Sequence, residues 1–351
     1  MTASMKHDLA LTLLEASRFP RRRWRLLAVT CAKEVTHTTD DLYIKSCIAQ
    51  RESLFHRLAG SQEEAVQAMI DDFSGDRSRH QLEAQPRLHA AAGGAAIQRA
   101  MNFVQDEKLA AAMQALDSWQ PLRCTPAEET VVFRMGLLRG RILRVQGRFN
   151  ESLNCLERHS AGSCEGLAFN EDLPDLVCEL ADTLRELEEP LRAEQLLRNE
   201  LARGSLEHRS SAQGLLKLCL AESLFAQGRF LQSNEVCSDV ESQPGLAKMG
   251  RLRLFITLAK LRHVERDWDA ALDLWTRALT TLCAFPLTGG VATRTVYLST
   301  CDVLRRRGQD ELELAARAKA TTLERLSKGA EAKHWIAGLR HWLAFLDSHG
   351  T

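Results

Sequence analysis

One short segment has the residue types for covalent chemistry. The sequence GSCEG at 162–166 has the outline of a nucleophile turn, with Cys164 as its nucleophile. A turn of this kind lies between a strand and a helix, and it needs a histidine delivered by the fold. The sequence on both sides of the segment is helical in pattern, and no strand precedes the cysteine. We therefore interpret the segment as a loop between helices and assign no catalytic residue.

Other pairs of reactive side chains are equally incomplete. Cys155 and His159 stand one helical turn apart, a spacing that metal sites use, but no further ligand has a matching spacing. The same holds for His334 and His341. The pair Gly93-Gly94 lacks the later glycine and lysine of a phosphate-binding loop, so it is better explained as the start of a closely packed helix. The sequence thus predicts no metal and no cofactor.

The strongest basic run consists of Arg21, Arg22, Arg23 and Arg25, which surround Trp24. It could act as a nuclear-import signal or contact an anionic surface. Because it precedes an amphipathic helix, a solvated helix end explains it better. The N-terminal residues lack a small-residue cleavage site and do not resemble a secretory signal. We expect a cytoplasmic protein, with a nuclear location left open by this run.

Composition predicts a helical chain. The 351 residues are 45% hydrophobic and 26% charged, and no apolar stretch is long enough to span a bilayer. The 46 basic and 46 acidic residues cancel, so the net charge does not favour nucleic acid or anionic lipid. Abundant Leu, Ala, Arg and Glu with few prolines favour helices. Ten cysteines occur without a C-x-x-C pair, which indicates buried thiols in a reducing compartment.

The elements that would position any site repeat along the chain. Residues 252–279 form two amphipathic helices around a polar turn, with Trp268 and Trp275 on the apolar face of the second. The same template fits at turn positions 107, 147, 188, 228 and 266, which are 38 to 41 residues apart. Weaker copies fit at Gly60 and at Gly308. In the Gly308 copy, Glu313 falls where the other copies have a small residue.

Small residues occur seven positions before and five positions after each clear turn. These pairs are Ala100 and Ala112, Gly140 and Ser152, Ala181 and Ala193, Ala221 and Ser233, and Ala259 and Ala271. Together with the Gly-Arg-Phe turns at 147–149 and 228–230, this pattern resembles the tetratricopeptide repeat (TPR). The period near 40 is longer than the family's usual 34, and the closing proline of the second helix is absent.

The resemblance implies an all-α fold, a right-handed superhelix of helix-turn-helix (TPR-like) repeats. The predicted organisation is an N-terminal helical cap at 1–45, about seven repeats at 46–325 and a C-terminal capping helix at 326–351. The last segment carries an apolar stripe of Trp335, Ile336, Leu339, Trp342, Leu343 and Leu346, whereas Lys333, Arg340 and Asp347 lie on its opposite side.

The resemblance also implies a concave groove lined by the first helix of each repeat. The residues that this places in the groove are Arg134, Arg141, Arg144, Asp182, Arg185, Glu222, Phe225, Arg253, Lys260 and His263. Their charges alternate in bands along the groove, which favours a protein or peptide partner of mixed charge. An ordinary solvated face is the alternative. The lysine and asparagine set with which chaperone-binding members grip a carboxylate is not matched.

These patterns favour a protein-interaction scaffold or adaptor without catalysis. The runner-up is an accessory or regulatory subunit of an enzyme complex, bound through its convex surface or its capping helix. A nucleic-acid-binding solenoid ranks third, because the net charge is zero and the tryptophans fall at core positions. A cysteine-based enzyme ranks last. The partner and the oligomeric state stay open, since a groove is read by surface detail.

Overall fold

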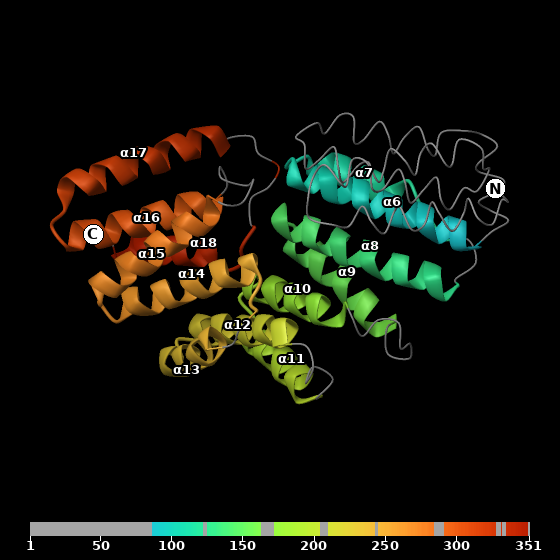
Figure 1. Ribbon diagram of the computed structural model, residues 1–351, viewed down its shortest axis with the longest axis horizontal. Coiled ribbons are helices and arrows are strands. Elements are labelled where there is room, and N and C mark those ends of the chain that lie inside the picture. Colours follow the sequence, from blue (N-terminus) through green and yellow to red (C-terminus); the bar gives the residue numbers. More distant parts are fainter. Residues whose placement is uncertain are drawn as a thin grey trace, which may run out of the picture. The chain divides into compact units, whose positions relative to one another are not determined.

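The computed structural model describes residues 86–121, 125–162, 172–203, 210–242, 245–283, 291–327, 331 and 335–349. Within these ranges the chain forms thirteen α-helices and no strand (Figure 1). The predicted all-α fold class is therefore confirmed. The expected N-terminal cap, the basic run at 21–25, the turn near Gly60 and the candidate nucleophile Cys164 lie outside the described residues.

The chain divides into two compact units, residues 1–135 and 136–351. The first unit contains α6 (Pro86–Gln105) and α7 (Leu109–Asp117), and the boundary falls inside α8 (Pro126–Val145). The second unit continues with α9 (Phe149–Gly162), α10 (Leu173–Glu186), α11 (Pro190–Ala202), α12 (Ser210–Ala226), α13 (Phe230–Glu241), α14 (Lys248–Val264), α15 (Trp268–Leu282), α16 (Val291–Arg306), α17 (Asp310–Ser327) and α18 (Leu339–His349).

Helices of the second unit pack as hairpins in sequence order. The pairs α10–α11, α12–α13, α14–α15 and α16–α17 are each joined by a three-residue turn, and the first helices α10, α12 and α14 also pack on one another (Figure 1). A hairpin that contacts only its neighbours can be extended without a larger core. This arrangement is consistent with an all-α repeat solenoid, whereas the division into 1–45, 46–325 and 326–351 stays a prediction.

The residues at the expected turn positions share one backbone conformation. Glu107, Gly147, Glu188, Gly228, Arg266 and Gly308 all have a positive φ between 59° and 84°. At Gly228 the amide donates to the Phe225 carbonyl at 2.9 Å, and the following Arg229 amide donates to the Leu224 carbonyl at 3.0 Å. These bonds form a Schellman motif, which satisfies the last carbonyls of the first helix and reverses the chain. The turn thus depends on one left-handed residue.

The predicted small residues let the two helices of a hairpin approach closely. Ala221 and Ser233 are fully buried, and the Ser233 hydroxyl donates to the Ala221 carbonyl at 2.7 Å. Ser152 donates in the same way to the Gly140 carbonyl at 2.8 Å, and a methyl group on Gly140 would collide with Leu156. Backbone contact of this kind is possible only where the side chains are small.

The last hairpin accommodates Glu313 where the others have a small residue. Its side chain is buried, and its carboxylate accepts from Arg317 Nε at 2.7 Å. The aliphatic part of the glutamate therefore fills the small-residue position, while an ion pair on α17 satisfies the charge. Gly308 still provides the left-handed turn, so the substitution changes the packing and leaves the turn intact.

Two further local predictions agree with the structure. Thr125 and Glu128 form a capping box at the start of α8: the Glu128 carboxylate accepts from the Thr125 amide at 3.0 Å, and the Thr125 hydroxyl accepts from the Glu128 amide at 3.4 Å. Trp275 is fully buried in the core of the second unit, and Trp268 is partly buried against that core. None of the described helices combines the length and the apolar character that crossing a bilayer requires.

Substitutions at two equivalent turn positions are expected to change the stability of the protein in opposite directions. Gly228→Ala is expected to lower stability by about 1–2 kcal/mol, because an alanine at a φ of +75° is strained although nothing lies within 4 Å of its added methyl group. Arg266→Gly is expected to raise stability by up to about 1 kcal/mol, since it relieves the same strain at a φ of 63°. Denaturant midpoints followed by circular dichroism measure both changes. Equal signs for the two variants would contradict this account of the turn.

Candidate functional site

Most of the charged residues predicted to line the groove come together in the second unit, and they bind one another. Arg141 and Arg144 on α8 both reach Glu179 on α10, with Nε–carboxylate distances of 2.5 Å and 3.1 Å. Arg144 also lies 3.8 Å from Asp182. The side chain of Arg144 is 3% exposed, whereas that of Arg141 is 40% exposed. The first of these ion pairs is therefore buried at one end and open to solvent at the other.

Arg253 on α14 is at the centre of the buried network. Its guanidinium donates to Asp182 Oδ1 at 2.7 Å and Oδ2 at 3.1 Å, and to Glu222 Oε1 at 2.9 Å. Arg185 on α10 also contacts Asp182, and it lies 2.7 Å from Glu222 on α12. Two guanidinium groups thus share two carboxylates across three first helices. A planar donor fork suits this bidentate arrangement.

Electrostatics keep the carboxylates of the network ionised. Burial alone would raise the pKa of Asp182, but Arg253, Arg185 and Arg144 outweigh it and lower the pKa to about 2. For Glu222, the attraction of Arg253 and Arg185 likewise exceeds the effect of burial and lowers the pKa. The pKa of Arg253 is raised well above its ordinary value, because Asp182 and Glu222 offset the cost of burying its charge. The network is therefore fully charged at neutral pH.

A group of metal-type ligands lies inside this network. Asp182, Cys219 and Glu222, all within the described part of the chain, have ligand atoms that lie within 4.8 Å of one another. The guanidinium of Arg253 already lies among them, and its Nη2 is 3.2 Å from Cys219 Sγ. A cation of the protein itself thus neutralises the cluster, and a metal ion would have to displace it.

Most of the charged residues predicted to line the groove are neutralised by other residues of the same chain, so no partner protein is needed to balance their charges. Arg144, Asp182, Arg185 and Arg253 are buried and paired within the second unit, and the side chain of Glu222 is mostly buried. Arg134 is exposed on the part of α8 that belongs to the first unit. Contact of these residues with a partner stays a prediction. Reversing the charge of Arg144 would disturb the buried ion pairs and so the folded structure. A loss of partner binding in such a variant would therefore not identify Arg144 as a contact residue.

The remaining three predicted residues, Phe225, Lys260 and His263, lie next to α18. His263 Nε2 is 3.0 Å from Asp302 Oδ2, and its ring makes an edge contact with Trp342 at a centroid distance of 5.2 Å. Phe225 contacts Trp342 at 6.1 Å. These contacts connect α12 and α14 to the C-terminal helix and α14 to α16.

Helix α18 was expected from its apolar stripe, but it begins at Leu339, four residues later than Trp335. Gly338 adopts a φ of 76°, which separates Trp335 and Ile336 from the helix. Ile336, Leu339 and Trp342 are buried, whereas Arg340 and Asp347 are exposed, as the stripe predicts. The buried side packs on α16, where Trp342 Nε1 donates to the Ser299 hydroxyl at 2.9 Å.

Glu186, the last residue of α10, holds the start of α18. Its Oε1 accepts from the Gly338 amide at 2.6 Å, and its backbone carbonyl accepts from Arg340 Nη2 at 2.7 Å. A carboxylate at the first turn of a helix is favoured by the helix dipole. Contacts with both α10 and α16 mean that α18 crosses the C-terminal ends of several first helices.

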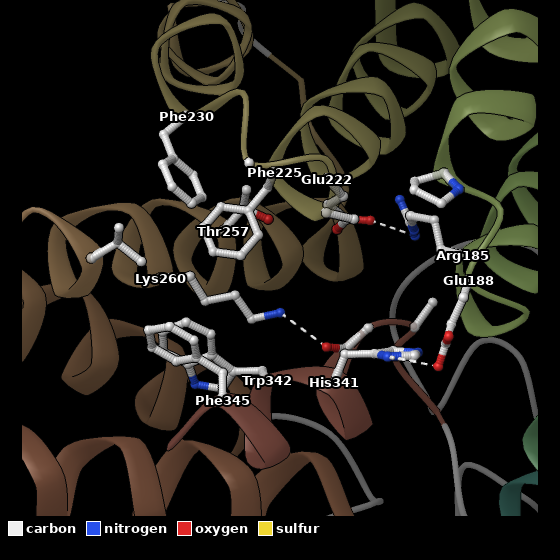
Figure 2. Close-up of a pocket in the computed structure, with 16 residues that line it drawn as sticks. Arg185, Glu188, Glu222, Phe225, Phe230, Thr257, Lys260, His341, Trp342 and Phe345 are labelled. Atoms are coloured by element: carbon white, nitrogen blue, oxygen red, sulfur yellow. Dashed lines mark hydrogen bonds and ion pairs between the residues drawn. The ribbon is translucent and has the colours of Figure 1, made fainter. Parts of the chain in front are cut away.

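A pocket of about 390 Å³ lies between α18 and the ends of α10, α12 and α14 (Figure 2). Its apolar walls include four aromatic residues, Phe225, Phe230, Trp342 and Phe345, while Arg185, Glu188, Glu222, Lys260 and His341 supply polar atoms. A concave site with apolar walls and few polar groups is typical of ligand-binding pockets. We take this pocket as the candidate functional site.

Lys260 is one of the polar groups that line the pocket. Figure 2 shows its side chain extending from α14 toward α18, between Phe225 and Trp342. Its Nζ is 3.4 Å from the Gly338 carbonyl and lies 5.8 Å and 5.7 Å from the two ring centroids. Burial lowers the pKa of Lys260 to about 8. The ammonium group of Lys260 therefore binds its proton more weakly than the guanidinium groups of the buried network bind theirs.

Sequence reasoning missed Phe230, Glu188, His341 and Phe345 as pocket residues. Phe230 was assigned to the Gly-Arg-Phe turn and Glu188 to a turn position of the repeat, so both were interpreted as structural. His341 lies on α18, with Nδ1 4.0 Å from Glu188 Oε1. The apolar stripe predicted for α18 contains neither His341 nor Phe345, and it does not reveal which surface the helix covers.

No protein-family model matches the sequence, and no curated protein is significantly similar to it. The resemblance to tetratricopeptide repeats therefore rests on the residues and their spacing.

Substitutions at the buried end and at the exposed end of the network are expected to lower the stability of the protein by different amounts. Arg253→Met is expected to destabilise the protein by about 3–5 kcal/mol, because it leaves Asp182 and Glu222 buried with too few cations. Arg141→Met, at the exposed end, is expected to cost less than about 1 kcal/mol. Denaturant midpoints of the two variants and the wild type measure the difference. Similar midpoints for both variants would show that the buried network does not hold the first helices together.

Proposed function

We propose that this protein is an interaction scaffold or adaptor without catalysis of its own, and that it binds a peptide segment of a partner protein. The pocket between α18 and the first helices receives one side chain of that peptide. The observation that carries the proposal is the aromatic lining of this 390 Å³ pocket. Rigid aromatic walls provide large contact area at low entropic cost, which is why such residues dominate interaction hot spots.

Charge pairing supports this placement of the partner. The acidic and basic bands predicted along the groove are largely satisfied by each other, so their net contribution to affinity for a partner is small. The pocket is different, because Lys260 has no carboxylate within 4 Å among the described residues and His341 is half-exposed. Binding energy is therefore concentrated in the pocket, with the surrounding charges fixing the register.

The rim gives the partner its polar contacts. Glu188 is 78% exposed and His341 is 36% exposed, and both belong to the pocket lining. Exposed charges at the rim of an interface steer association and select orientation more than they add affinity. A peptide with an apolar anchor and flanking charges of both signs suits this arrangement. An accessory-subunit role, with α18 or the outer helices as the contact, remains the alternative proposal.

Adjacent residues of α13 offer a matched test of the proposal. Phe230→Ala removes a pocket wall, whereas Leu231→Ala removes a side chain that is 81% exposed and is not part of the pocket. Peptides selected on the wild-type chain from a displayed random library are expected to bind Phe230→Ala at least tenfold more weakly and Leu231→Ala unchanged. Fluorescence anisotropy of labelled peptides gives the dissociation constants.

The helical circular dichroism signal of both variants serves as the folding control. The proposal fails if no peptide is enriched, or if the enriched peptides bind Phe230→Ala and the wild type equally. Loss of binding in Leu231→Ala alone would instead favour the accessory-subunit alternative, because that side chain lies on the outer helix of its hairpin.

A further inference from the structure

We infer that this pocket is a binding site for an organic carboxylate attached to an apolar or aromatic group, with Lys260 as the residue that binds the carboxylate. The inference rests on the proposed function and deepens it, because it names the chemistry of the group that enters the pocket. It follows from the pairing state of Lys260, from the walls around it and from the charges that face it.

Lys260 is a buried cation that is short of hydrogen-bond acceptors. The residue is 8% exposed, and among the described residues its one hydrogen bond is the 3.4 Å contact with the Gly338 carbonyl. An ammonium group has three N–H donors, so most of its donor capacity is directed at the pocket. Burying a charge without a full set of partners costs free energy. A bound carboxylate supplies the missing acceptors and the opposite charge.

The walls select what is attached to the carboxylate. Phe225, Phe230, Trp342 and Phe345 surround the space beside Lys260, with Trp342 and Phe345 stacked at a centroid distance of 4.9 Å. An inorganic anion would leave these surfaces in contact with water. An apolar or aromatic body of the ligand would cover them and gain about 25 cal/mol for each Å² buried. The pocket thus suits a ligand with one charged end and one apolar end.

The charges around Lys260 limit the ligand to a single negative charge. The groups that face Lys260 from the surrounding elements are Arg185, Glu186, Glu188, Glu222, Arg253 and His341. The guanidinium groups of Arg185 and Arg253 are taken by Asp182 and Glu222, so Lys260 is the cation left to bind an anion. A dianion such as phosphate would be repelled by Glu222 and Glu188. A monocarboxylate balances Lys260 alone.

The probe for the test is 3-phenylpropanoate, and its neutral amide, 3-phenylpropanamide, is the matched control. Isothermal titration of the full chain is expected to show binding of the acid at least tenfold tighter than of the amide. Lys260→Met, which removes the charge and keeps an unbranched side chain one atom shorter, is expected to abolish this preference. Lys248→Met, an exposed lysine at the start of the same helix, is expected to keep it.

Two arms distinguish the sources of the carboxylate. The tetrapeptide Ala-Ala-Ala-Phe is compared as a free acid and as a C-terminal amide beside 3-phenylpropanoate. Tighter binding of the peptide acid than of 3-phenylpropanoate identifies a peptide C-terminus, whereas binding of 3-phenylpropanoate with exclusion of the peptide identifies a free carboxylic acid. Equal affinities for acid and amide on the wild type, or no binding of either acid, overturn the inference even if Lys260→Met fails to fold.

These outcomes are separable from those of the peptide selection. Peptides that depend on Phe230 but bind Lys260→Met as tightly as the wild type would support the scaffold and overturn the carboxylate inference. A preference of 3-phenylpropanoate over its amide with no enriched peptide would support the inference and overturn the scaffold.

The titration of Lys260 adds a pH test. Its pKa of about 8 in the unliganded protein means that above pH 8 the neutral amine must take up a proton when the carboxylate binds. The association constant of 3-phenylpropanoate is therefore expected to fall about tenfold between pH 7 and pH 9, while the carboxylate itself stays charged. Isothermal titration in buffers of different ionisation enthalpy detects the proton uptake. A constant affinity across this range would contradict the role of Lys260.

Discussion

The buried ion pairs among Arg253, Asp182, Glu222 and Arg185 are the constraint on which the second unit depends. They join α10, α12 and α14 through side chains that are nearly inaccessible to water. Taking such charges out of water costs several kcal/mol for each ion, and only good geometry recovers that cost. The network therefore favours one register between neighbouring hairpins, because a shift along the helix axis would separate every pair at once. Apolar packing alone tolerates such shifts more readily.

Local features of this fold were accessible from the sequence, because they depend on residues close together in the chain. The turns need one left-handed residue after the first helix, and glycine at 147, 228 and 308 marks it directly. Glu188 and Arg266 lack that marker, yet the spacing located them. The network was not accessible in the same way. Arg141, Asp182 and Arg253 lie on α8, α10 and α14, but the sequence did not show whether they face solvent or one another. Whether they face one another depends on the lateral distance between neighbouring hairpins. Opposite charges about one repeat apart in the sequence were nevertheless a usable signal that such side chains could pair.

The pocket was harder to predict because one of its walls comes from α18, which is distant in the sequence from α10, α12 and α14. Trp342 and Phe345 belong to α18, but the predicted apolar stripe contains only Trp342, and it indicates only that one side of this helix is buried. Which surface it covers is decided by specific contacts, among them Glu186 with the Gly338 amide and Ser299 with Trp342 Nε1. A helix that packed only on the last hairpin, α16–α17, would not contact Glu186 on α10. Its contacts instead extend across the first helices, and this creates an enclosed space where a bare helix face would otherwise be open.

Arg253 and Lys260 show why the candidate site lies where it does. They are seven residues apart on α14 and so lie on the same face of that helix, both nearly buried. Arg253 has a fork of donors that bonds to two carboxylates, and it functions as part of the fold. Lys260 presents a single charged atom to two aromatic rings and one carbonyl. Cation–π contacts of this kind contribute about 0.5–2 kcal/mol, less than the cost of burying an ammonium group. The same helix face thus changes over two turns from a paired guanidinium to an ammonium group with one carbonyl acceptor among the described residues, which is why we propose the ligand site at the second.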